Sequence, residues 1–157
     1  MRLFAIFFVC LFSVSAAFAE DPVKKNELSI EFRRASFEQQ EGWKASKMKD
    51  GEKEIFLHPQ AEIDLSDVEK VSLSKNEQID EDTVILELTK AGGVKMRKLT
   101  GEHLNQPLAI LVNGKVFMAP VIRSEIGGKL QISGLSEIEA KSLVVEFGKR
   151  TQKPKSE

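Results

Sequence analysis

Apolar and polar residues alternate over several short stretches of the chain, which is the pattern of strands with one buried face. The strands predicted from this pattern cover residues 28–33, 68–73, 83–88 and 130–133, and a short one is expected at 54–58, before Pro59. The intervening residues 37–52 are polar and contain glycine, so they are interpreted as a long loop or irregular arm.

A β-hairpin is predicted where two apolar runs, Leu108–Val112 and residues 115–119, are separated by Asn113-Gly114. This pair is well suited to the positive φ angles at both centres of a type I′ turn. The predicted register pairs Leu111 with Val116, Ile110 with Phe117, and Ala109 with Met118. Since both faces are apolar, we expect the hairpin to be covered on two sides. Pro120 has no N–H and should end the second strand.

The first of two predicted helices follows Thr89 and extends to about Leu104. Its apolar side carries Met96 and Leu99, with His103 on the same face. Gly92-Gly93 weakens the start of this helix, because glycine costs about 1 kcal/mol relative to alanine in a helix interior.

The second predicted helix begins at a capping box formed by Ser136 and Glu139. Its apolar stripe consists of Ala140, Leu143, Val144 and Phe147. Gly148 is the expected C′ residue. With the strands, these helices predict an α+β fold, in which two helices pack on a mostly antiparallel sheet that contains the Asn-Gly hairpin.

The first 19 residues are typical of a cleavable signal peptide. Arg2 provides a short positive region, residues 3–12 are apolar, and Ala17-Phe18-Ala19 is an A-x-A cleavage signature. The alternative is an uncleaved membrane anchor, for which the apolar stretch is barely long enough. We therefore expect a signal peptide at 1–19, a single domain at 20–148, a disordered charged tail at 149–157, and a periplasmic or otherwise extracytoplasmic location.

After cleavage the chain would have no cysteine, no excess of basic residues and no long apolar segment. Cys10, the only cysteine, leaves with the signal peptide, and removing Arg2 from the 23 basic residues leaves 22 against 24 acidic ones. This balance gives no reason to expect nucleic-acid binding. No later stretch approaches the roughly 20 apolar residues of a membrane helix, so no span is expected after cleavage.

Catalytic, cofactor and metal sites are not predicted. His58 and His103 are too few for a metal site, and the pattern around Ser133-Gly134 is not a nucleophile elbow. Glu62 with Asp64, and the run 80–82, could in principle support acid–base chemistry, but acidic loop residues more often solvate or cap. A hydrolase is therefore the least favoured alternative.

The hairpin and the residues after it resemble the SecD family of bacterial protein export, in the head part of its first large periplasmic domain. The matching residues are Leu108-Ala109-Ile110, Asn113-Gly114-Lys115-Val116, Ala119-Pro120-Val121-Ile122, Ile126-Gly127-Gly128, Gln131-Ile132-Ser133-Gly134 and Glu139-Ala140, with Thr89, Gly92, Met96 and Leu99 before the hairpin. The likeness is strong from about Val84 to Gly148 and weak upstream of it. The motif residues Asn113, Gly114, Ala119, Pro120, Gly127, Gly128 and Gly134 are interpreted as structural, since they supply turns and strand ends.

The candidate partner-binding residues are Trp43, Phe117 and Met118. Trp43 is the only tryptophan and lies in the polar arm, where it either packs the arm onto the domain or anchors a partner. Phe117-Met118 replaces the small or polar residue that the resemblance leads us to expect before Ala-Pro.

The resemblance implies a non-enzymatic exported protein that binds polypeptide or an envelope partner, as an accessory to protein export. The expected partners are a translocon component or exported chains, held at a sheet edge or groove. The alternative is a regulatory or structural envelope module with no role in translocation.

Overall fold

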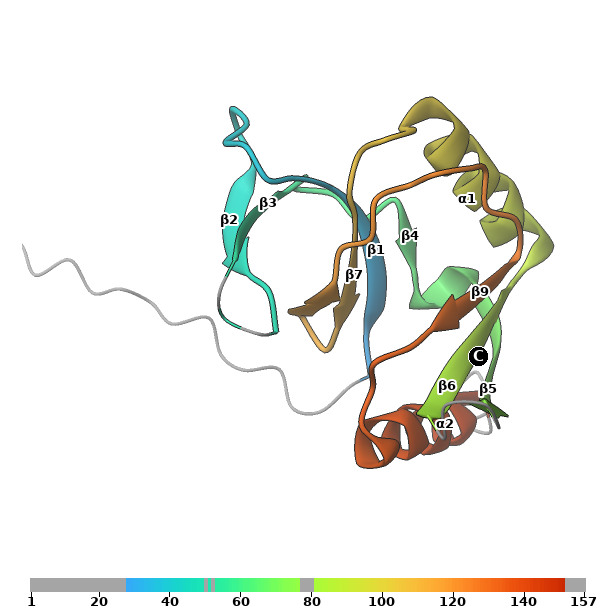
Figure 1. Ribbon diagram of the computed structural model, residues 1–157. Helices are drawn as coiled ribbons and strands as arrows, with labels where there is room; N and C mark the ends of the chain where they lie inside the picture. The colour runs from blue at the N-terminus through green and yellow to red at the C-terminus, as the bar shows by residue number, and fades with distance from the viewer. Residues whose placement is uncertain (1–27, 50, 52, 77–80, 152–157) are drawn as a thin grey trace, which may run out of the picture.

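The computed structural model describes residues 28–49, 51, 53–76 and 81–151 (Figure 1). The strands are β1 (Ile30–Ser36), β2 (Lys44–Lys47), β3 (Glu54–Leu57), β4 (Ile63–Asp64), β5 (Val68–Asn76), β6 (Glu81–Leu88), β7 (Leu108–Val112), β8 (Lys115–Met118) and β9 (Lys129–Ile132). The helices are the 3₁₀ turn η1 (Leu65–Asp67), α1 (Lys90–Glu102) and α2 (Glu137–Thr151). The predicted α+β class, with mostly antiparallel strands and two helices, is confirmed. Within these residues no helix has the length and apolar character to cross a membrane.

The strands form two sheets. The larger one has the order β2-β3-β1-β7-β8, with β4 also paired to β1, and the smaller one has the order β5-β6-β9. All the strand pairings are antiparallel. A parallel bridge between Met48 and Val116 joins the chain after β2 to β8, so the larger sheet curls round until its outer strands meet (Figure 1).

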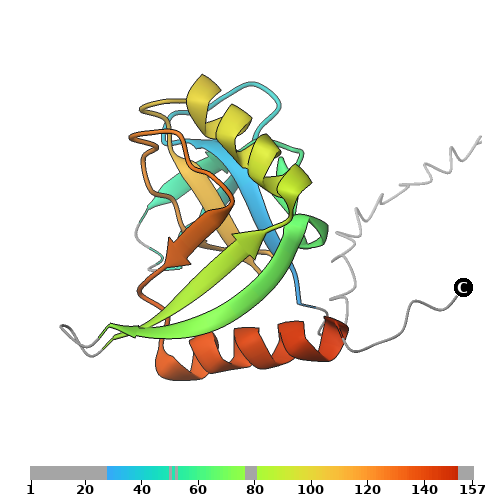
Figure 2. The same ribbon diagram turned by 90° about the vertical axis from the view of Figure 1, so that its right-hand side faces the viewer.

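Two apolar cores result from this arrangement. The larger lies between the two sheets and the helices, whose arrangement Figure 2 shows. It includes Phe32, Leu86, Met96 and Phe147. The smaller core lies inside the curl of the larger sheet, and its residues belong to β1, β3, β7 and β8. They are Ala35, Ile55, Leu57, Ala109, Leu111 and Val116. Alternate residues of β7 belong to different cores, which explains the unbroken apolar run from Leu108 to Leu111.

The strands β7 and β8 are joined by Asn113 and Gly114, whose φ angles are 51° and 75°. The Asn113 side chain also accepts a hydrogen bond from the backbone N–H of Ser29 (3.0 Å), which ties the turn to the start of β1. Leu111 lies opposite Val116 as predicted, but Ile110 lies opposite Met118. The predicted pairings of Ile110 with Phe117 and of Ala109 with Met118 are wrong, because an irregularity in the pairing next to Phe117 shifts the register by one residue.

Helix α1 begins at Thr89, whose hydroxyl accepts a hydrogen bond from the N–H of Gly92 (3.0 Å). The predicted cost of Gly92-Gly93 is offset by close packing. A Cβ on Gly92 would lie 2.6 Å from the carbonyl oxygen of Asp67, and one on Gly93 would lie 3.1 Å from Cα of Gly128. The ammonium of Lys95 pairs with the buried Asp67 at 2.9 Å and further fixes the helix on η1.

Helix α2 has the predicted capping box. The backbone N–H of Ser136 donates to the carboxylate of Glu139 (2.9 Å), and the N–H of Glu139 donates back to the serine hydroxyl (3.4 Å). The expected stop at Gly148 is wrong, because the helix continues to Thr151. Its last turn is held by Arg150, which donates to the carbonyl oxygen of Leu28 (3.2 Å). The predicted tail therefore starts too early, while residues 152–157 and the predicted signal peptide lie outside the described residues.

The polar arm 37–52 contains a strand that sequence patterning missed. β2 pairs with β3 in a register that sets Lys44 opposite Leu57 and Lys47 opposite Glu54. Its side chains are mostly exposed. Backbone pairing, not an apolar face, therefore forms this strand.

Candidate functional site

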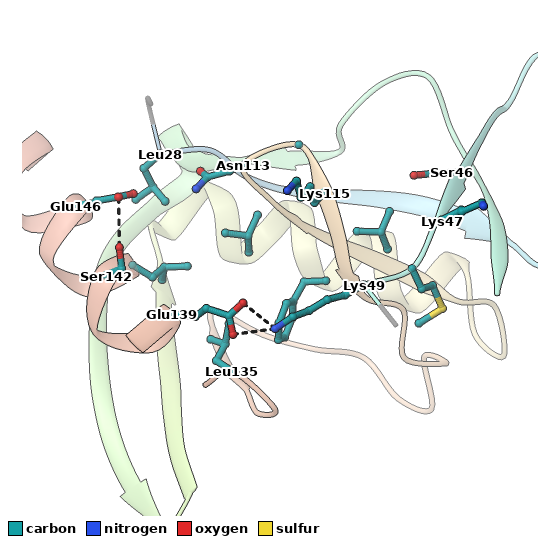
Figure 3. Close-up of a pocket in the computed structure, with 16 residues that line it drawn as sticks. Leu28, Ser46, Lys47, Lys49, Asn113, Lys115, Leu135, Glu139, Ser142 and Glu146 are labelled. Carbon is teal, nitrogen blue, oxygen red and sulfur yellow. Dashed lines mark hydrogen bonds and ion pairs between the residues drawn. The ribbon is translucent and has the colours of Figure 1, made fainter. Parts of the chain in front are cut away.

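A groove of about 610 Å³ lies between β2, the β7–β8 hairpin and α2 (Figure 3). It is lined by Leu28, Ser46, Lys47, Met48, Lys49, Val112, Asn113, Gly114, Lys115, Val116, Phe117, Leu135, Glu139, Ser142, Leu143 and Glu146. These residues come from four separate parts of the chain, which the fold brings together.

One wall of the groove is a face of α2 together with Leu135, two residues before the helix. Leu135, Glu139, Ser142 and Glu146 are spaced by four, three and four residues, so they lie along one side of the helix. Within the helix the lining residues run from Glu139 to Glu146, and seven residues of helix span about 11 Å at 1.5 Å per residue. The groove therefore runs along α2 for about two turns, and its helical wall carries the two carboxylates of Glu139 and Glu146.

The opposite wall comes from strands and carries the opposite charge. Lys47 and Lys49 belong to β2 and the turn after it, and Lys115 begins β8. Within the described residues, Lys47 and Lys115 have no ion-pair partner, and both are exposed. Apolar side chains, including Val112 of β7 and Phe117 of β8, also line the groove.

The side chain of Lys49 crosses the groove to the helical wall (Figure 3). Its ammonium donates to both carboxylate oxygens of Glu139, at 2.7 and 2.8 Å, and lies 4.6 Å from the ring centroid of Phe117. Both partners of the ion pair remain nearly half exposed.

The carboxylate of Glu139 is held on the other side by Ser136, whose hydroxyl and backbone N–H both donate to it (2.7 and 2.9 Å). The hydrogen bond from Lys49 is the main cause, and those from Ser136 the next, that lower the pKa of Glu139 from 4.5 to about 2. The group is therefore a fixed anion at physiological pH.

Trp43 lies outside this groove. Its half-buried ring meets the ring of His58 edge-on at 5.5 Å and lies 5.9 Å from the guanidinium carbon of Arg34. Arg34 in turn donates to Glu62 at 2.7 Å. These contacts support the interpretation in which the tryptophan packs the arm onto β1 and β3.

The three predicted partner-binding residues are not brought together. Phe117 lines the groove, whereas Met118 packs against the larger core and does not line it. Lys49, Glu139 and Glu146 were missed as site residues. Only Glu139 had a sequence signal, and that signal was for helix capping.

The structural motif residues lie at turns, strand ends and close contacts. Pro120 accepts a hydrogen bond from the N–H of Leu108 (2.9 Å), and Gly128 accepts one from the N–H of Leu88 (2.7 Å). Ala119 packs on the smaller core. A Cβ on Gly127 would lie 3.7 Å from the guanidinium of Arg97, and Gly134 has a φ of 80°. These positions lie outside the groove, which among the motif residues includes only Asn113 and Gly114.

The residues weighed for catalysis have structural partners. The carboxylate of Asp64 caps η1 and accepts from Ser66 (2.7 Å), and these hydrogen bonds lower the pKa of Asp64. His103 is the C-cap of α1. Across the described ranges, no three histidine, cysteine or acidic side chains gather as a possible metal site. Of the run 80–82, Asp80 and the side chains of Glu81 and Asp82 lie outside what the structure describes.

The fold defines the class first: it is an α+β domain with two mostly antiparallel sheets and two packed helices. A solved structure of SecDF, described as a membrane component that enhances protein export, superposes with a TM-score of 0.60 at 23% identity, over 77% of this chain and 62% of that one. The model of the family "SecDF, P1 head subdomain" matches residues 37–147, and the chain belongs to this family. The match extends well upstream of Val84, where the likeness had been expected to weaken.

Curated relatives match over a shorter region. The translocase subunit SecD of Magnetococcus marinus is 43% identical over 58 residues, which are 36% of this chain and 11% of that protein. The SecDF subunit of Thermus thermophilus is 42% identical over 60 residues, or 38% of this chain and 8% of that protein. The chain thus spans about a tenth of the length of these relatives.

Proposed function

We propose that this protein is an extracytoplasmic, non-enzymatic module that binds extended polypeptide as an accessory to protein export. The groove along α2 is the observation that carries the proposal, since membership of the SecDF P1 head family supplies only the link to export.

The dimensions of the groove support an extended occupant. The helical wall, about 11 Å long, corresponds to roughly three residues of extended chain at about 3.3 Å per residue. The apolar residues that line the groove would bury apolar side chains of the bound peptide. The charged residues of the two walls would contact its backbone and polar groups. A site of this kind favours short unfolded segments over the surface of a folded protein.

Site-specific photo-crosslinking in living cells tests this function. A photoreactive residue at Ser142 places the probe on the helical wall of the groove. The same residue at Lys98, which is exposed on α1 and does not line the groove, is the matched control. We expect probes at Ser142 to capture many different exported chains, in amounts that rise with secretion load, and probes at Lys98 to capture few.

Equal yields from both positions would contradict the assignment of the groove. A single partner captured at Ser142, in an amount unaffected by secretion load, would instead support a regulatory or structural envelope module. Recovery of neither exported chains nor translocon subunits would refute the link to export.

A further inference from the structure

The ammonium of Lys49 occupies a site with the features of a receptor for a cation. A carboxylate contacts it through both oxygens, an aromatic face lies 4.6 Å away, and Ser136 fixes the carboxylate from behind. Carboxylates form charge-assisted hydrogen bonds with cationic side chains, and aromatic faces attract them electrostatically. This site opens onto the groove, and a residue 90 positions away in sequence fills it.

We infer that Lys49 is an internal mimic of the ligand: it holds the place of a lysine or arginine side chain of the bound polypeptide, which displaces it on binding. The inference rests on the proposed function, because it names the chemistry of the segment that the groove takes. Lys49 reaches the site from the turn between β2 and β3, and that turn is closed by a bond from the N–H of Gly51 to the carbonyl of Met48 (2.8 Å). The lysine side chain can therefore swing out while the strands stay paired.

The two walls select one basic side chain, not a high positive charge. Glu139 and Glu146 would attract cations to the helical wall, but Lys47 and Lys115 on the strand wall would repel them. The preferred segment is therefore apolar and close to neutral, with a single lysine or arginine facing α2.

Fluorescence anisotropy with three labelled peptides tests this inference. The protein is purified in the form in which it accumulates in cells. The first is an apolar, unstructured 12-residue peptide with one arginine, the second has glutamine in its place, and the third carries four arginines. We expect Lys49→Met to bind the one-arginine peptide about threefold more tightly, the scale of an exposed ion pair, and to bind the glutamine peptide as the wild type does. The four-arginine peptide should bind no better than the one-arginine peptide.

Two further variants separate the displacement of Lys49 from Glu139 from other effects on binding. Glu139→Gln keeps the capping box, which accepts glutamine, and should remove the preference for arginine over glutamine. Lys44→Met removes an exposed lysine of β2 that does not line the groove, and it should behave as the wild type. Thermal unfolding of each variant checks that the fold is intact.

The outcomes distinguish the inference from the function on which it rests. If Lys49→Met binds the one-arginine peptide no more tightly, or gains equally for the glutamine peptide, Lys49 is not a ligand mimic. If all forms bind the peptides without preference, the groove binds polypeptide but the inference is wrong. If no form binds any peptide, the proposed function itself fails.

Discussion

Replacing Gly92 by alanine tests how closely α1 approaches η1. The new Cβ would lie 2.6 Å from the carbonyl oxygen of Asp67 and 2.9 Å from its Cβ, both far inside contact distance. That oxygen also accepts a hydrogen bond from the N–H of Thr89 (2.8 Å), so it cannot retreat freely. Overpacking of this kind costs about 1–3 kcal/mol. Alanine recovers up to about 1 kcal/mol in helix propensity, which leaves a net loss of up to about 2 kcal/mol when that recovery is complete.

Gly148→Ala is the matched control, since Gly148 lies in α2 and a Cβ there would meet no atom within 4 Å. The same substitution should therefore stabilise the protein at Gly148, by up to about 1 kcal/mol.

Urea unfolding followed by circular dichroism gives both free energies of unfolding, provided that the slopes match the wild type. In thermal unfolding, each change of about 1 kcal/mol in the free energy of unfolding should shift Tm by about 4 °C. If Gly92→Ala raises the urea midpoint as much as Gly148→Ala does, the close approach of α1 to η1 is wrong.

Three further predictions concern single side chains. Thr100→Val should lower the free energy of unfolding by about 1–3 kcal/mol, since the buried hydroxyl is the acceptor for the N–H of Ile126 (2.8 Å); Thr100→Ser, which keeps the hydroxyl, should lose less in the same urea titration. The pKa of Glu139 in the folded protein is about 2, below its ordinary value of 4.5. The contribution of the Glu139 carboxylate to the free energy of unfolding is therefore complete above pH 4.5 and is lost as pH falls towards 2. Because the side chain is well exposed the effect is screened, and the difference in urea midpoint between wild type and Glu139→Gln should shrink from pH 6 to pH 2; a difference independent of pH would contradict the assignment. Gly114→Ala should cost about 1–2 kcal/mol from its φ of 75° alone, with no steric contact, so its unfolding slope should equal that of the wild type.

Elements set by neighbouring residues were predictable from the sequence. The capping box of Ser136 and Glu139 and the cap at Thr89 depend on residues three apart, so their chemistry is visible in the chain. The apolar stripe of α2 was predicted for the same reason. The end of that helix was not, because Gly148 is helical and a distant contact from Arg150 to Leu28 holds the last turn.

Features that depend on distant residues could not be predicted. β2 is polar and exists because its backbone pairs with β3. The reason for Gly92 appears only when Asp67 is placed beside it. The groove was missed because its walls are separate in sequence, and the ion pair that crosses it joins Lys49 to Glu139.

The strand β7 has a consequence for how the molecule opens. Leu108 and Ile110 face one core, while Ala109 and Leu111 face the other, and β1 is likewise shared. If either core were to melt alone, it would expose one side of a strand whose other side is still packed. The two cores should therefore unfold as a single cooperative unit, with the amides of β7 exchanging hydrogen only through global unfolding. Any movement that admits a ligand is then confined to the turns and side chains at the rim.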